Sequence, residues 1–181
     1  AIACLRGAHA ETPLMRVVRA LAGDMIARGG EANSAATGRE KAREAIADGD
    51  ALDRFRTFVE AQGGDPSVVD DPSSRPQSDP VATVRVPDDA EGYVADLDAL
   101  GIGHAAVDLG AGRRTKEDDV DPVAGLSDLK KPGDPVEPGD VLARLHTSRS
   151  PDLDPVREAV RNAYTFADSP PDLDPPVKAR Y

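Results

Sequence analysis

The sequence lacks tryptophan, contains a single cysteine and has few aromatic residues. Phe, Trp and Tyr together make up only 3% of the 181 residues, so any core must rest on Ala, Val, Leu and Ile. Such a core is thin for one unit of this length, which favours two modest cores or a fragment completed by other sequence. The single cysteine, Cys4, excludes an internal disulfide and is typical of a reducing compartment.

Long apolar segments are also missing. No run of about 18 apolar residues could cross a membrane, and no charged segment followed by an apolar one indicates a signal peptide. We therefore expect a cytoplasmic protein that does not bind membranes.

Lysine is scarce, and the formal net charge is −11. The acidic residues are mostly Asp and the basic ones mostly Arg, with Lys only at positions 41, 116, 130, 131 and 178. An acidic surface repels phosphate backbones, so we expect no nucleic-acid partner. The bias fits a protein from a salt-rich cytoplasm, where salt screens self-repulsion, and it also fits a genome rich in G and C.

The amino terminus has no methionine and begins inside a helical pattern. The segment AIACLRG is typical of the last turns of a helix that ends at Gly7, and no cap precedes Ala1. We therefore expect a chain cut from something longer. Whether it is an expressed piece, a proteolytic product or a natural short protein stays open.

Residues 1–64 predict helices. Each pattern repeats apolar residues at helical spacing between a cap and a glycine stop. The three patterns run from Thr12–Pro13 to Gly29–Gly30, from Ser34 to Asp48–Gly49, and from Asp50, as a cap, to Gly63–Gly64. Each helix has an apolar face that must be buried against another structural element.

The predicted secondary structure changes after a proline-rich segment. Residues 65–80 carry four prolines and little hydrophobicity, which indicates a domain boundary or a connecting loop. Beyond it we expect strands at 81–86, 92–97, 123–130 and 141–147, and helices at 98–109 and 156–166. The second domain is therefore predicted to be α+β.

Several separated motifs give the chain a family resemblance. They are AQGGDPSVVDD at 61–71, EGYVADLDALGIGHAAVDLGAGRRTKEDDVDPVAGL at 91–126 and KKPGDPVEPGDVLARLH at 130–146. In this order they resemble the carboxy-terminal part of the pyrimidine-nucleoside and thymidine phosphorylases. The most characteristic group is Gly110–Arg113, followed by the Asp121–Gly125 turn and the Gly-Asp pairs at 133–134 and 139–140.

The resemblance implies a fold and a division into domains. Members of the family have a helical domain, a central α/β domain that holds phosphate, and a carboxy-terminal α+β domain of barrel-sandwich type. On that template residues 1–70 are the closing helices of the α/β domain and 71–80 a linker. Residues 81–181 are then the whole carboxy-terminal α+β domain.

The resemblance also implies a reaction, the reversible phosphorolysis of thymidine or uridine to the free base and a pentose 1-phosphate. The family holds phosphate with a Lys-x-Ser-Thr-Gly-Gly segment and the pyrimidine with an Arg and a Lys, and none of these matches a position here. We therefore expect no catalytic residue and no cofactor in this chain, and no activity from it alone. Nucleoside, phosphate and the family's amino-terminal dimer helices would belong to the full enzyme. So would a candidate monovalent-cation site, whose glutamate falls just upstream of Ala1.

Arg113 and Arg114 are the only candidate substrate-binding residues. With Gly110, Gly112 and Lys116 they form a glycine-basic loop in an acidic protein. Such a loop can fold over a cleft when domains close, or it can be an ordinary loop whose arginines pair with nearby aspartates. The acidic run that follows, Glu117 to Asp121, does not match a calcium loop, so we expect a solvated turn and no metal site.

Other chemistry-bearing residues favour structural roles. His9, His104 and His146 have no paired spacing, and Cys4 has no partner motif, so we expect surface or partly buried side chains. The phrase PGDPVEPGDVLARLH also resembles half of a biotinyl or lipoyl carrier domain, with Lys130 and Lys131 as candidate modified lysines. That carrier and a stand-alone binding module are the alternatives to a phosphorylase.

Overall fold

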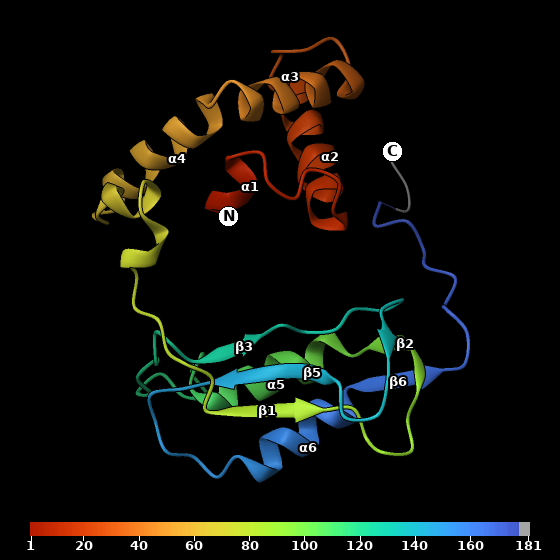
Figure 1. Cartoon of the computed structure of the whole chain (residues 1–181). Coiled ribbons are helices and arrows are strands. Elements are labelled where there is room, and N and C mark those ends of the chain that lie inside the picture. The colour runs from red at the N-terminus through yellow and green to blue at the C-terminus, as the bar shows by residue number, and fades with distance from the viewer. Residues whose placement is uncertain (178–181) are drawn as a thin grey trace. The chain divides into compact units, whose positions relative to one another are not determined.

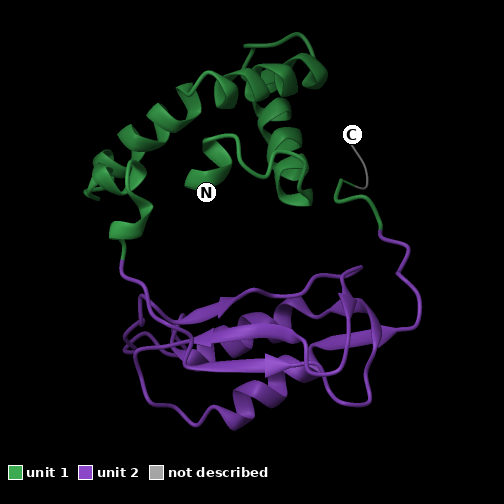
Figure 2. Ribbon diagram, in the orientation of Figure 1, with its two compact units in different colours: residues 1–75, 174–181 green, residues 76–173 purple. Residues whose placement is uncertain are grey.

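The computed structural model describes residues 1–177. Helices combine with small antiparallel sheets, so the predicted α+β class is confirmed. The chain divides into two compact units, with unit 2 spanning Pro76–Leu173 and unit 1 containing Ala1–Arg75 and the tail from Asp174 (Figure 2). This division falls inside the segment 71–80 that the sequence predicts to be a linker. The last part of the predicted domain 81–181, residues 178–181, lies outside the described residues.

Unit 1 is helical (Figure 1). Its α-helices are α1 (Ile2–Leu5), α2 (Pro13–Arg28), α3 (Ala35–Ala47) and α4 (Asp50–Ala61), and the 3-10 turns η1 (Pro66–Val69) and η2 (Pro72–Ser74) follow. Two helix starts are those that the sequence predicts: the Thr12 hydroxyl accepts from the Met15 amide, and the Ser34 hydroxyl accepts from the Thr37 amide.

The start of α4 differs from the prediction. Asp50 is the first helical residue, and the cap position belongs to Gly49, which has a φ of 90°. The Gly49 carbonyl accepts from the amides of Leu52 and Asp53. Glycine adopts this left-handed conformation without a steric penalty, so the turn between α3 and α4 needs no side-chain cap. Asp50 acts instead as an acidic group in the first turn.

Helices α2 and α3 approach each other through glycines. A Cβ atom at Gly38 would collide with the carbonyl of Gly23, and one at Gly23 would collide with the Arg39 side chain. Both glycines are buried. The contact is therefore between backbones, and it leaves little room for large side chains between these two helices.

Unit 2 contains two three-stranded antiparallel sheets and two helices (Figure 1). One sheet has the order β1-β5-β3, from Ala82–Arg85, Val141–His146 and Gly125–Ser127, and the other β4-β2-β6, from Pro135–Val136, Gly92–Leu97 and Tyr164–Ala167. The helices are α5 (Ala99–Leu109), which the Asp98 carboxylate caps at the Leu100 amide, and α6 (Asp154–Asn162).

The predicted helix 156–166 is too long. Helix α6 ends at Asn162, and Tyr164–Ala167 forms strand β6, which pairs with β2 from Tyr93 to Leu97. Tyr and Phe alternate with smaller residues in this segment and favour a strand once a partner is available. The predicted strand 123–130 is also shorter, because only Gly125–Ser127 pairs with β5.

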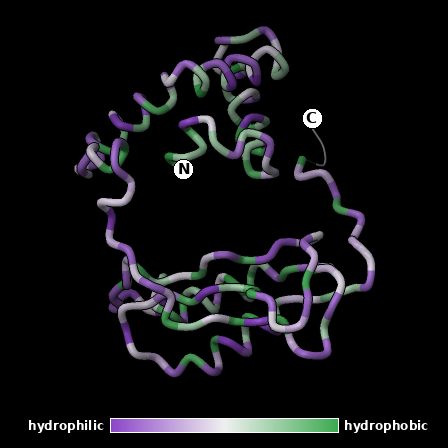
Figure 3. The backbone as a smooth tube through the Cα atoms, in the orientation of Figure 1, coloured by the Kyte–Doolittle hydropathy of each residue, from purple (hydrophilic) through white to green (hydrophobic). Residues whose placement is uncertain are grey.

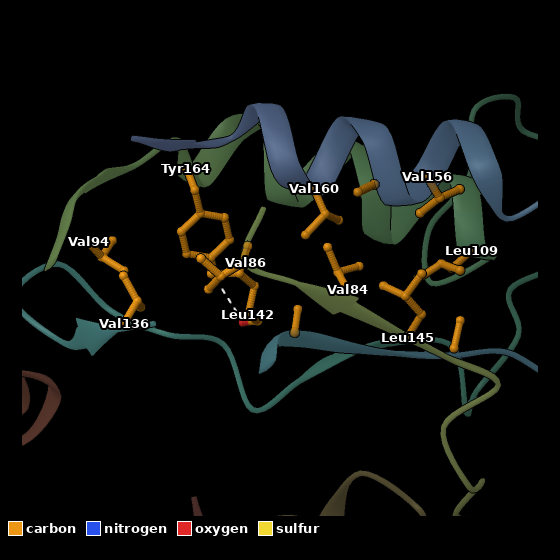
Figure 4. Close-up of a cluster of buried hydrophobic side chains, with 13 residues drawn as sticks. Val84, Val86, Val94, Leu109, Val136, Leu142, Leu145, Val156, Val160 and Tyr164 are labelled. Atoms are coloured by element: carbon orange, nitrogen blue, oxygen red, sulfur yellow. Dashed lines mark hydrogen bonds between the residues drawn. The ribbon is translucent and has the colours of Figure 1, made fainter. Parts of the chain in front are cut away.

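The core of unit 2 lies between the strands and helices α5 and α6 (Figure 4). Leu142 and Leu145 from β5, Val84 from β1 and Val160 from α6 are fully buried there. Tyr164 points its hydroxyl into this core and donates to the carbonyl of Leu142 at 3.1 Å or of Lys130 at 3.2 Å. Burial, with the Asp134 carboxylate nearby, raises the pKa of Tyr164 to about 12, so the hydroxyl remains a donor.

Candidate functional site

The glycine-basic loop follows helix α5 in unit 2. Gly110 ends the helix with a φ of 107°, and Arg113, Arg114 and Lys116 are exposed beyond it. The left-handed conformation at Gly110 turns the chain out of the helix. The structure therefore places the two predicted arginines together on one exposed loop of unit 2.

The two arginines differ in how they are held. The Arg114 guanidinium forms an ion pair with Asp108 of α5, and its backbone amide donates to the Asp118 carboxylate at 2.9 Å. That carboxylate also accepts from the amide of Thr115, at 3.0 Å, and from its hydroxyl, at 2.7 Å. Arg113 makes no hydrogen bond or ion pair with any residue in the described part of the chain. Of the pair, Arg113 keeps its guanidinium available.

Asp118 closes the loop on itself. Its hydrogen bonds, first from the Thr115 hydroxyl and then from the Thr115 and Arg114 amides, lower the pKa of the Asp118 carboxyl. The side chain therefore stays charged at neutral pH and fixes the turn. Part of the acidic run is thus a structural device that shapes the basic loop.

Asp121 is buried, so the predicted solvated turn is wrong at this position. Its side chain is 4% exposed, and it accepts from the Ser148 amide at 2.6 Å, the Thr147 hydroxyl at 3.1 Å and the Val123 amide at 3.1 Å. The Asp121 amide donates to the Gly110 carbonyl at 2.8 Å. We call Asp121, Thr147 and Ser148 the Asp121 anchor. It joins the far end of the basic loop to the segment after β5.

These hydrogen bonds favour the charged form of the Asp121 carboxylate. Chiefly through the Ser148 amide, and against the effect of burial, they lower the pKa of Asp121 to about 2. The sequence holds one signal of this role, because Asp121 precedes Pro122 and bonds to the amide two residues on, as Asx turns do. Its pairing with Thr147 and Ser148 depends on tertiary structure and has no sequence signal.

Arg149 links the two ends of the loop. Its guanidinium donates to the carbonyl of Asp119, and its backbone amide donates to the Thr147 hydroxyl at 3.0 Å. A Cβ atom at Gly110 would lie 3.2 Å from the Arg149 guanidinium. Both the conformation and the space at Gly110 therefore favour glycine.

The histidines lie apart from this loop. The His146 ring makes contacts of 2.9 Å from Nε2 to the Ser127 hydroxyl and from Nδ1 to the Ser78 carbonyl, so it joins the start of unit 2 to its sheet. His9 and His104 are exposed, and Cys4 is half-buried. The structure does not bring these residues together with Arg113 and Arg114.

The carrier lysines differ in exposure. Lys130 is 28% exposed and donates to the Pro135 carbonyl at 2.9 Å, with the Asp140 carboxylate 3.7 Å away. Lys131 is exposed, and its amide donates to Asp134 at 2.7 Å. A carrier lysine must project freely so that its attached group can travel, and Lys130 is held against its own hairpin.

Among residues 1–177, no group of three or more His, Cys, Asp or Glu residues could hold a metal ion. Nor does any helix there have the length and apolar composition needed to span a bilayer.

Comparisons with known proteins identify the second unit. Residues 93–167 match the family model for the pyrimidine nucleoside phosphorylase C-terminal domain. The pyrimidine-nucleoside phosphorylases of Staphylococcus aureus strains USA300 and NCTC 8325 / PS 47 are each 38% identical over 155 residues. The match covers 86% of this chain but only 35% of each relative, so the chain spans about a third of their length. Unit 2 thus carries the pyrimidine nucleoside phosphorylase C-terminal domain, and the chain as a whole is similar to the carboxy-terminal portion of pyrimidine-nucleoside phosphorylases.

Proposed function

We propose that this chain is the carboxy-terminal part of an enzyme that uses phosphate to split pyrimidine nucleosides into free base and pentose 1-phosphate. The observation that carries the proposal is the family match over 93–167, joined to relatives named pyrimidine-nucleoside phosphorylase. On this proposal residues 1–70 are the closing helices of an α/β domain, and unit 2 is the carboxy-terminal domain of barrel-sandwich type.

Unit 2 then presents the basic loop to the substrate cleft. The Asp121 anchor and the Asp118 turn fix the two ends of the loop, and Arg114 is paired with Asp108. Arg113, exposed and without a partner in the described chain, is the group best placed to contact an anionic substrate. A rigid base with one free guanidinium suits a loop that closes over a cleft.

The isolated chain is inactive on this proposal, because no Lys-x-Ser-Thr-Gly-Gly segment for phosphate occurs in it. It carries no cofactor of its own, while phosphate, and in addition a monovalent cation, bind to the full enzyme. The net charge of −11 opposes nucleic-acid binding, and the lone Cys4 suits a cytoplasmic enzyme. Dimerisation would use amino-terminal helices of the full enzyme.

A chimera tests the proposal. The carboxy-terminal segment of the Staphylococcus aureus enzyme is replaced by this chain, and release of base from thymidine and from uridine is followed with and without phosphate. We expect phosphate-dependent turnover by the chimera and none by the isolated chain. A chimera that folds but releases no base would contradict the proposal, and turnover by the isolated chain would refute its inactivity.

Arg113 gives a sharper test in the same chimera. Arg113→Ala should lower kcat/KM by roughly tenfold, since one charged hydrogen bond to substrate is lost. Arg161→Ala removes an exposed arginine from α6 and serves as the matched control. Equal effects of the two variants would remove Arg113 from the substrate contacts. Mass spectrometry of Lys130 and Lys131 tests the carrier alternative, which requires an attached biotinyl or lipoyl group.

A further inference from the structure

A pocket in unit 1 is lined mainly by arginines. It has a volume of about 400 Å³ and is lined by Arg16, Arg19, Arg39, Glu40, Arg43 and the tail residues Pro175, Pro176 and Val177. We call it the arginine pocket. Four cations against one carboxylate are unexpected in a chain whose net charge is −11.

Helix geometry gathers these side chains. Arg16 and Arg19 lie one turn apart on α2, and Arg39 and Arg43 lie one turn apart on α3, so each pair shares a helix face. The backbone contact between Gly23 and Gly38 brings the two faces together. Gly23 also leaves the space in which the aliphatic part of Arg39 lies, because a Cβ there would collide with it. The glycine pair therefore builds the pocket as well as the packing.

Two of the four arginines have their charge compensated by the protein. The Arg43 guanidinium donates to the Glu40 carboxylate at 2.9 Å. Arg19 donates to the carbonyls of Ala10 and Met15 and lies 3.7 Å from Glu11. Thus the one carboxylate that lines the pocket is already engaged.

Arg39 and Arg16 have no such compensation. The Nη1 atom of Arg39 is buried and has no hydrogen-bond partner, the one such side-chain atom found among residues 1–177. Arg16 is exposed, and its guanidinium makes no hydrogen bond or ion pair with the described residues. A buried, unpaired guanidinium nitrogen is costly, and a bound ion is one of the ordinary ways in which proteins satisfy such a group.

We propose that the arginine pocket binds a phosphate group, either as inorganic phosphate or as a phosphate monoester. Guanidinium groups present paired N–H donors that match the oxygens of a tetrahedral dianion. Arginines from α2 and from α3 can therefore bind the same phosphate group from two sides. The volume also admits the sugar of a phosphate monoester. This assignment does not rest on the proposed phosphorolysis, because it concerns unit 1 residues that hold an anion without any reaction.

Isothermal titration of the full chain tests the assignment. Inorganic phosphate and ribose 5-phosphate are titrated separately, at low salt and without nucleoside, with acetate as a singly charged comparison. We expect saturable binding of at least one phosphate compound at concentrations below about 10 mM, weaker binding at higher salt, and none of acetate. The compound that binds more tightly identifies the source of the phosphate group.

Variants assign the binding to the pocket. Arg39→Gln and Arg16→Gln should each weaken it by roughly tenfold, and Arg39→Lys should fall between Arg39→Gln and the parent because it keeps charge but loses the paired donors. Arg54→Gln, an exposed arginine of α4 outside the pocket, should change nothing. Arg16 is exposed, so its variant preserves the fold even if Arg39→Gln does not. No binding of either phosphate compound, or equal binding by the parent, Arg16→Gln and Arg39→Lys, would overturn the assignment.

Discussion

Unit 1 and unit 2 bury their apolar residues to very different extents. In unit 2 the fully buried large side chains include Leu109, Leu142 and Leu145, whereas Val69 is the one such residue of unit 1 among residues 1–177. Helix α2 instead exposes a row of apolar residues, Leu14, Val18, Leu21 and Met25. Figure 3 colours the residues of both units by their hydropathy. Unit 2 therefore completes its own core, while unit 1 depends on small residues at a helix contact and contributes less stability.

The largest effect is expected from truncating one leucine in each unit, which compares the stability that a buried and an exposed side chain contribute. Leu145→Ala in unit 2 should lower the free energy of unfolding by about 3 kcal/mol, because a fully buried side chain leaves a cavity. Leu21→Ala in unit 1, where the side chain is 60% exposed, should change it by less than about 0.5 kcal/mol. Urea unfolding followed by far-UV circular dichroism measures both variants. Similar costs for the two variants would remove the contrast between the units.

A pair of glycine substitutions examines the helix contact in unit 1. Gly38→Ala should cost about 2 kcal/mol, since the added methyl group would meet the Gly23 backbone and force α2 and α3 apart. Gly103→Ala, on the exposed face of α5 with open space around it, should instead stabilise unit 2 by about 0.5–1 kcal/mol. Urea unfolding followed by far-UV circular dichroism distinguishes the two signs. A neutral Gly38→Ala would show that α2 and α3 can separate without cost.

Acid should weaken unit 2 through the Asp121 anchor. The pKa of Asp121 is about 2 in the folded chain and near 3.9 in an unfolded one, so its contribution is present above about pH 4 and lost as pH falls toward 2. Asp121→Asn should lower the thermal unfolding midpoint by roughly 5 °C at pH 7. Between about pH 4 and 2, the midpoint of the variant should fall less with decreasing pH than that of the parent. Thermal unfolding across this range gives both values. If the unfolding midpoint of the variant falls with pH as steeply as that of the parent, other carboxylates cause the loss of stability in acid.

The smallest effect is expected at the tip of the basic loop. Arg113→Ala should alter the stability of unit 2 by less than about 0.5 kcal/mol, because the side chain is exposed and forms no hydrogen bond or ion pair in the described chain. Arg114→Ala, which loses the exposed ion pair with Asp108, should cost at most about 0.5–1 kcal/mol. Thermal unfolding of both variants provides the measurement. A large loss for Arg113→Ala would give it a structural role in place of substrate contact.

Local signals predicted most of the elements. Thr12 before Pro13, Ser34 and Asp98 are caps where the sequence predicts them, because capping depends only on neighbouring residues. Strand β6 was missed because its residues follow a helix without a break and become a strand only by pairing with β2. The change of cap from Asp50 to Gly49 likewise follows from a backbone conformation that the residue types leave open.

The sites were predictable to a lesser degree. The basic loop follows from glycine and arginine spacing, and the structure gathers Arg113 and Arg114 on it, although their role in substrate binding remains a prediction. Asp121 resembled its exposed neighbours in sequence, and only its pairing with Thr147 and Ser148 separates it from them. The arginine pocket has regular spacing within each helix, but which helices meet depends on the Gly23–Gly38 contact.

The strand order of unit 2 has a consequence for the order of events during synthesis. Ala82 of β1 pairs with Leu145, and Tyr93 of β2 pairs with Ala167, so the first sheet cannot close before β5 has left the ribosome and the second cannot close before β6 has. The helices of unit 1 use neighbouring residues and can form as they emerge. Until β5 arrives, β1 presents unpaired backbone groups and the side chain of Val84 to other nascent chains. Between translation of β1 and of β5, the open edge of β1 is therefore a site at which nascent chains can pair with one another.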